Sequence, residues 1–248
     1  VYASDLNPVA CMLTWGAFNV VGASREDHEK MQKHQQRIMS EIDQEIEAMG
    51  VEHDAVGNRA KVFLYCLETR CPRTGWMVPL APSWIVSKQR NVVVDLVPDH
   101  ENERYEFEVR SGVSAQDMKA AAEGTVRNGR LFHPVLDDDL GVSMKEIRGD
   151  YRDREGNTQN LLRAWEKEDF IPRADDIWQE RLYAIQWMDS KGIKEGRANP
   201  RTWFDVPTGE DLAREEQVNR IVLQNLASWQ DHGLVPDMQI EPGVKTRE

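Results

Sequence analysis

Val92-Val93-Val94-Asp95-Leu96-Val97 and Tyr105-Glu106-Phe107-Glu108-Val109 are the stretches that decide the fold class of this chain. Both are rich in β-branched and aromatic residues, and turn-forming residues separate them. Similar short runs occur at 62–66 and 84–86. We therefore expect a small antiparallel sheet between residues 60 and 110.

Helical patterns lie on both sides of this sheet region. Ser24 is a suitable helix cap, and the acidic residues Glu26 and Asp27 follow it. Apolar residues then recur at steps of seven, four and three, and the pattern stops before Gly50. This pattern predicts a long amphipathic helix, and a short helix is expected from Ala115 to Gly124. Another is expected from about Asp175, where it would bury Ile177, Leu182, Ile185 and Met188. A last helix is expected to begin at Thr208 and to end before Gly233.

The remaining segments are shorter. Residues 130–135 and 142–147 are possible further strands, and 148–160 reads as a polar loop punctuated by glycine. At the N-terminus, Val1-Tyr2-Ala3 resembles the end of a buried strand, and Pro8 suits the first turn of a helix. The N-terminus is therefore expected to form a strand-loop-helix unit.

Composition limits the classes of protein that fit. The 248 residues suffice for one large domain or two small ones, and 40% are hydrophobic. No apolar run approaches the roughly 20 residues that cross a bilayer. Three cysteines favour a reducing compartment, so we expect a cytoplasmic protein without a disulfide framework. The ends of the sequence suggest a piece of a longer protein.

The formal net charge of −12 repels a polyanion such as DNA. Contact with nucleic acid would therefore need a local basic face. Arg148, Arg152, Arg154 and Arg163 lie in or beside the glycine-containing loop and could follow a phosphate backbone. Acidic residues alternate with them, so the alternative is a solvated surface of paired charges.

A candidate ligand site precedes the first helix. Asp5 follows a strand-like run, and a carboxylate at this place in an α/β fold can accept hydrogen bonds from both hydroxyls of a ribose. The alternative is that Asp5 and Asn7 form a turn that caps the helix.

The segment DLNPVA at 5–10 resembles the second motif of S-adenosylmethionine-dependent DNA methyltransferases that act on exocyclic amino groups. The likeness extends over nearly the whole chain, to adenine-specific DNA methylases that contain a zinc ribbon. The segments that carry it are TRCPRTGWMVPL at 69–80, GDYR at 149–152, WEK at 165–167, QERLY at 179–183 and PDMQIEPG at 236–243.

The resemblance implies an α/β protein with a partial Rossmann-like methyltransferase core and an α+β insertion that contains the small antiparallel sheet. Residues 1–54 would belong to the core and the long helix, 55–172 would form the insertion as a degenerate zinc-ribbon-like sheet, and 173–248 would be a helical segment that leads back to the core. In that family the acidic residue of the second motif binds the cofactor ribose, so Asp5 and Asn7 become cofactor-binding candidates. The partners would be DNA and the remainder of the methyltransferase chain, without a membrane.

The family also carries an upstream glycine-rich cofactor loop and a downstream Asp-Pro-Pro-Tyr catalytic motif. Neither occurs in this sequence. We therefore expect no catalytic residue within the chain and no methyl transfer by it alone. The resemblance suggests a restriction-modification or phage-defence setting, and cytosine is the alternative target base.

A zinc ribbon needs four ligands, usually from two Cys-x-x-Cys knuckles. Cys71 matches the first ligand of the family's first knuckle, but Thr74 stands at the second ligand position. In the stretch that resembles the second knuckle, His133 and Leu136 stand at the ligand positions. Only Cys71 and His133 could bind metal, so zinc is not expected unless Cys66 joins them, and the ribbon is expected to remain as a metal-free sheet.

Two hypotheses about the function of this protein follow. The first is an enzyme segment that belongs to a DNA adenine methyltransferase. The second is a free-standing DNA-recognition or protein-interaction module without catalytic activity. The histidines show no His-x-x-x-His spacing and no Ser-His-Asp arrangement, which leaves hydrolase readings without support.

Overall fold

The computed structural model describes residues 8–238, which form a mixed α/β protein in two compact units, 1–51 and 52–248. No helix in this described part is both long and apolar enough to span a membrane.

The first unit is helical where it is described. It contains α1 (Pro8–Gly16), a π-helical turn η1 (Ala17–Val21) and α2 (Arg25–Met49). Ser24 caps α2 by accepting a hydrogen bond from the Asp27 N–H, and Gly50 ends the helix with a positive φ of 66°. The long helix is therefore confirmed at both ends. The strand expected at 1–3 lies outside the described residues.

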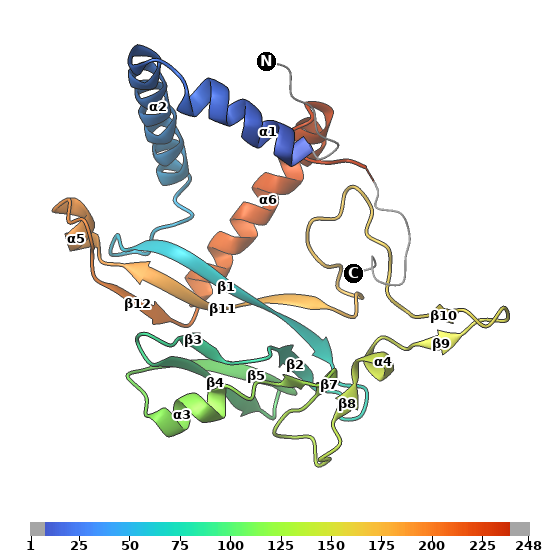
Figure 1. The fold of residues 1–248 in the computed structure, drawn as a ribbon. Coiled ribbons are helices and arrows are strands. Elements are labelled where there is room, and N and C mark those ends of the chain that lie inside the picture. Colours follow the sequence, from blue (N-terminus) through green and yellow to red (C-terminus); the bar gives the residue numbers. More distant parts are fainter. Residues whose placement is uncertain (1–7, 239–248) are drawn as a thin grey trace. The chain divides into compact units, whose positions relative to one another are not determined.

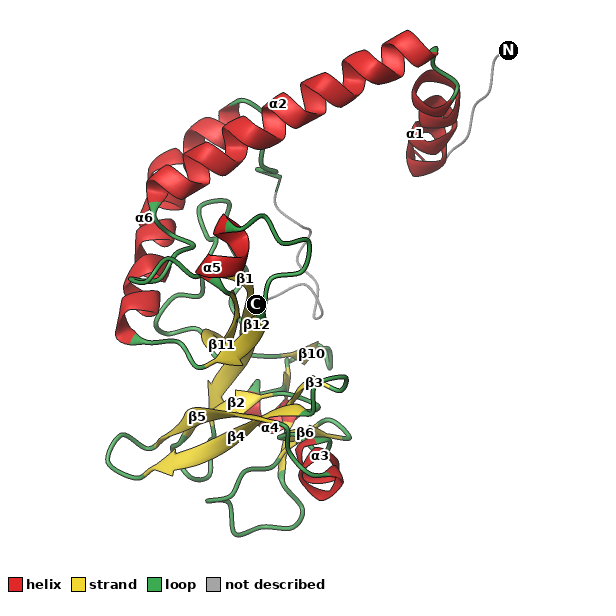
Figure 2. Cartoon of the chain, turned by 90° about the vertical axis from the view of Figure 1, so that its left-hand side faces the viewer, coloured by secondary structure: helices red, strands yellow, loops and turns green. Residues whose placement is uncertain are grey.

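A seven-stranded sheet organises the second unit within the described residues, in the order β12-β11-β1-β2-β5-β4-β3. Its strands are β1 (Arg59–Arg70), β2 (Met77–Leu80), β3 (Ile85–Ser87), β4 (Val92–Asp99), β5 (Arg104–Ser111), β11 (Gln179–Met188) and β12 (Thr202–Asp205). Figure 2 shows these strands together, coloured yellow. The pairs are antiparallel except β2 with β5, which run parallel where Met77 faces Arg104.

The expected small antiparallel sheet is thus part of a larger mixed sheet. The runs that indicated it form β1, β3, β4 and β5, and β4 and β5 pair along their whole length. The added strands come from residues 179–205, which pair with β1. The parallel pair β2–β5 provides no Rossmann-like core, so that part of the expected fold stays a proposal.

The prediction of a helix from about Asp175 is wrong, because residues 179–188 form strand β11. This strand pairs with β1 from Arg59 opposite Met188 to Glu68 opposite Gln179. Pairing with a central strand satisfies the backbone of 179–188 and buries Leu182 and Ile185, which are 3% and 0% exposed.

Smaller elements surround the sheet. The described residues include α3 (Ala115–Ala121), β6 (Val126–Arg127), β7 (Arg130–Leu131), β8 (Val142–Ser143), α4 (Met144–Ile147), β9 (Tyr151–Arg152), β10 (Thr158–Gln159), α5 (Ser190–Lys194) and α6 (Gly209–Asp231). β6, β7 and β8 form one small antiparallel sheet, and β9 and β10 form another. The expected strand at 142–147 is therefore only two residues long and turns into α4.

Helix α6 is confirmed where capping signals predicted it, and α3 is confirmed from Ala115 but ends at Ala121, short of the expected Gly124. Thr208 and Asp211 form a capping box at the start of α6, with the Asp211 N–H donating to Thr208 Oγ1 and the Thr208 N–H donating to Asp211 Oδ2. The Tyr65 hydroxyl on β1 donates a hydrogen bond to Glu215 of α6, and burial together with this carboxylate raises the pKa of Tyr65.

Candidate functional site

Residues 71–76 form a tight turn between β1 and β2. The Gly75 N–H donates to the Cys71 carbonyl at 2.9 Å, and the Cys71 N–H donates to the Trp76 carbonyl at 2.8 Å. Gly75 has a φ of 80°, a value that suits glycine. Cys71 is fully buried at the base of this turn.

His133 lies directly against this turn, although it is 59 residues from Thr74 in the sequence. Its Nδ1 is 2.8 Å from the Tyr105 hydroxyl, and its Nε2 is 3.4 Å from Thr74 Oγ1. The Val135 N–H donates to the same Tyr105 oxygen at 3.2 Å. Because the Tyr105 oxygen accepts from Val135, its own O–H can donate to Nδ1 of His133. The matching tautomer of His133 carries its proton on Nε2, which donates to Thr74 Oγ1.

Leu136 completes what we call the knuckle cluster, formed by Cys71, Thr74, Tyr105, His133 and Leu136. Leu136 packs against the buried apolar group that contains Cys71 and Tyr105. All four positions that resemble zinc ligands therefore lie in one place. Burial lowers the pKa of His133 to about 4, so its imidazole is neutral at pH 7.

The knuckle cluster does not fit a structural zinc ion. It offers one thiol and one imidazole, because a hydroxyl and an isobutyl group stand at the other two positions. Cys66 lies in a different buried group, with Trp84 and Val94, and its thiol donates to the Arg181 carbonyl at 3.7 Å. Burial raises the pKa of Cys66 to about 12, which disfavours a thiolate. Within 8–238, no three His, Cys, Asp or Glu side chains are grouped so that they could hold a metal ion.

The four candidate DNA-binding arginines fall into two pairs. Arg148 makes two hydrogen bonds to Asp150, at 3.0 and 2.8 Å. Arg163 makes two hydrogen bonds to Asp176, at 2.7 and 2.6 Å, and also bonds to Asp169. The carboxylates of Asp176 and Asp169 are only 2% and 7% exposed, so Arg163 stabilises the loop internally.

Arg152 and Arg154 are instead exposed, on the β9–β10 hairpin that projects from its neighbours in Figure 1. Arg152 donates to the Gly156 carbonyl at 2.8 Å, and in the described part of the chain neither guanidinium forms an ion pair. Asp153, which lies between them, accepts hydrogen bonds from the Asn157 N–H and from Gln159 Nε2. The hairpin therefore presents two exposed guanidinium groups whose charge is not paired with a carboxylate among the described residues.

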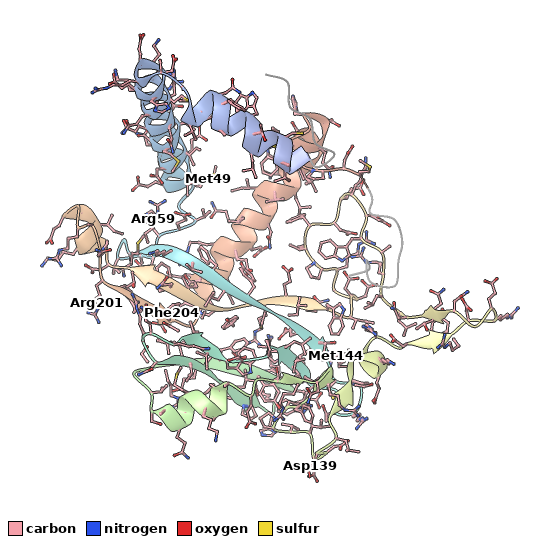
Figure 3. All side chains as sticks on the ribbon, viewed as in Figure 1. Met49, Arg59, Asp139, Met144, Arg201 and Phe204 are labelled. Atoms are coloured by element: carbon pink, nitrogen blue, oxygen red, sulfur yellow. The ribbon has the colours of Figure 1, made fainter. Side chains whose placement is uncertain are left out.

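The remaining predicted site residues, Asp5 and Asn7, lie outside the described residues. Sequence reasoning missed a cavity of about 920 Å³ beside His133, between β4, α3 and the loop at 124–139. Arg127 stacks on the Phe132 ring in its wall, with the guanidinium carbon 4.2 Å from the ring centre. Asp139, labelled in Figure 3, lies on its rim. No sequence pattern indicated this cavity, because its walls come from separate elements.

No protein-family model matches this sequence, and no curated protein or solved structure compared with the chain gives a significant match.

Proposed function

We propose that this chain is a segment of a DNA methyltransferase, which transfers the methyl group of S-adenosylmethionine to the exocyclic amino group of adenine. The observation that carries the proposal is the meeting of the two stretches that resemble zinc knuckles. Thr74 and His133, each at a ligand position, come within 3.4 Å of each other across 59 residues of sequence. A chance likeness of two short stretches gives no reason for them to meet.

In this proposal Asp5 accepts hydrogen bonds from the cofactor ribose, and residues 55–172 form an insertion that contacts DNA. The β9–β10 hairpin supports the second role, because its two exposed guanidinium groups have no carboxylate partner among the described residues and could contact phosphate oxygens. The arginine pair that is bound to aspartates is assigned a structural role instead. The net charge of −12 then confines DNA binding to this local element.

The cofactor role is tested in a longer protein that adds the flanking coding sequence. Asp5→Ala removes two charge-assisted hydrogen bonds, so the dissociation constant for S-adenosylmethionine should rise about 30- to 1000-fold. Calorimetric titration measures this change. Unchanged affinity in a folded variant would reduce Asp5 to a turn residue.

Methyl transfer from radiolabelled cofactor to DNA compares the longer protein with the 248-residue chain. We expect transfer only by the longer protein, because the chain lacks the glycine-rich loop and the motif that positions the base. Turnover by the isolated chain would contradict the proposal that it is a segment.

The DNA contact is tested by Arg152→Gln with Arg154→Gln. The double variant should bind all DNA sequences more weakly, and its salt dependence should fall by roughly one unit per lost phosphate contact. Lys191→Gln with Lys194→Gln on exposed α5 removes the same charge and serves as the matched control. Equal salt slopes for the arginine variant and the parent would exclude the hairpin as the contact.

The alternative is a free-standing recognition module. It is favoured by the second unit, which is compact by itself and contains the three buried apolar groups found among residues 8–238. DNA binding by this chain combined with no methyl transfer by the longer protein would favour the module.

A further inference from the structure

A second cavity, of about 230 Å³, lies between β11, β12, the turn before β1 and the start of α6. Its lining includes Trp187, Trp203, Asp54, Asp205, Glu210 and Arg214. It is distinct from the knuckle cluster and from the hairpin, and neither reading of function uses it. Figure 3 labels Phe204 on β12, the strand that contributes Trp203, and Arg201 immediately before it.

Two indole rings supply the apolar wall of this cavity. Trp187 and Trp203 are direct partners in the antiparallel β11–β12 pair, so their side chains project from the same face of the sheet. Trp187 is 6% exposed among Ala60, Leu182 and Ile185, and Trp203 packs against this group. The aromatic wall is therefore fixed by the core.

The remaining wall is acidic. Asp54 is oriented by the N–H groups of Val56 and Asn58, at 3.0 and 2.8 Å. Asp205 and Glu210 are both exposed, and Asp205 accepts only its neighbour's N–H among the described residues. The fourth carboxylate, on Asp211, is paired with Arg214. Three acidic residues, Asp54, Asp205 and Glu210, thus line the cavity without an ion pair among the described residues, and the one cation in the lining, Arg214, is held by Asp211.

We propose that this cavity binds a quaternary ammonium group. Two indole rings line the cavity, and an indole ring attracts a cation through the negative electrostatic potential of its face and favours contact with methyl groups over water. Three carboxylates exclude anions and add attraction for a positive charge. A bare ammonium keeps a tight hydration shell, whereas a methylated one gives up water readily and presents the apolar surface that the wall needs. The cavity has room for one such group and its attached chain.

The test is a titration of the full chain with tetramethylammonium chloride, at constant ionic strength maintained with potassium chloride. Resonances of the indole N–H groups report on each tryptophan separately. We expect saturable shifts of the Trp187 and Trp203 signals, with no such shift when potassium is the only cation added. The absence of a saturable shift would overturn the proposal, and so would an equal response to potassium.

Substitutions of Trp203 measure how much its aromatic ring contributes to binding of the cation. Trp203→Ala should weaken binding about 10-fold and Trp203→Phe less, because a phenyl ring attracts cations less strongly than indole. Trp15→Phe on α1 is the matched control and should leave affinity unchanged.

Asp205→Asn with Glu210→Gln changes exposed side chains without disturbing the fold and should weaken binding several-fold. Unchanged affinity in this acidic double variant would also overturn the proposal.

Two further ligands distinguish the possible sources of the ammonium group. Choline represents a small metabolite, and a peptide with trimethyllysine represents a modified protein. The same peptide with unmodified lysine should bind more weakly than the trimethylated one, and equal binding would contradict the proposal. None of these outcomes depends on methyl transfer or on DNA.

Discussion

His133 should make the stability of this protein depend on pH. Burial lowers its pKa to about 4, whereas an unfolded histidine titrates near 6.5. Between these values the unfolded chain binds more protons, so the folded state loses stability as the pH falls from about 6.5 to about 4. The loss reaches about 2 to 3 kcal/mol.

Urea unfolding at pH 7.5 and at pH 4.5 measures this contribution. Carboxylates titrate in the same range, so the test is the difference between the parent and His133→Gln. The variant should be less stable at pH 7.5 and should lose less stability on acidification. Parallel pH profiles would show that the imidazole is not buried as a neutral group.

Arg163 should matter for stability more than for DNA binding. Arg163→Ala leaves the carboxylates of Asp169 and Asp176 buried without their main counter-charge, which costs about 3 to 5 kcal/mol. Arg173→Ala, in which the lost guanidinium is 42% exposed, should cost much less. Thermal unfolding of both variants provides the comparison. A similar loss for the two would mean that burial of the pair contributes little.

Among the elements, those with local signals were predictable and those that depend on distant partners were not. Ser24 and Thr208 each cap a helix whose start the sequence indicates within a residue or two. Strand β11 was instead predicted as a helix, because Leu182, Ile185 and Met188 follow a helical spacing. Leu64 pairs with Ala184 and Tyr65 with Leu182, so Tyr183 is an extra residue on β11 that interrupts the alternation that marks a strand.

The candidate sites show the same limit. Only the resemblance suggested that residues 71–74 and 133–136 would meet, since nothing local to either stretch indicates the other. For the four arginines, the sequence left paired charges and DNA contact as alternatives, with the paired surface favoured. The structure divides them, because Arg148 and Arg163 pair with aspartates, whereas Arg152 bonds to the Gly156 carbonyl and neither Arg152 nor Arg154 has an ion pair among the described residues.

The ribbon should accept zinc once its missing ligands are restored. In Thr74→Cys with Leu136→Cys, the ligand set becomes three thiols and one imidazole, and His133 already directs Nε2 toward position 74 while Tyr105 orients Nδ1. Elemental analysis should find about one zinc per chain in the double variant and none in the parent. Zinc in the parent would mean that Cys66 is recruited. No zinc in the variant would mean that the four positions are not tetrahedral.

At the scale of the whole molecule, the two units should be separable. The described part of 1–51 has no fully buried side chain, and the apolar residues Met31, Ile38, Ile42 and Met49 on α2 are 37–48% exposed. Deleting residues 1–51 should therefore change the melting temperature of the remainder by no more than about 2 °C. Calorimetry of both proteins tests this. A large loss would show that the helices stabilise the sheet.

The position of β1 inside the sheet, between β11 and β2, has a consequence for synthesis of the protein. One edge of β1 pairs with nearby β2, but the other waits for β11, whose Arg181 is 115 residues after Cys66. A ribosome that adds 5 to 20 residues per second leaves that edge open for roughly 6 to 23 s. During this interval the nascent chain exposes an unpaired strand rich in Val, Phe, Leu and Tyr, which is the kind of surface that chaperones bind and that aggregates capture.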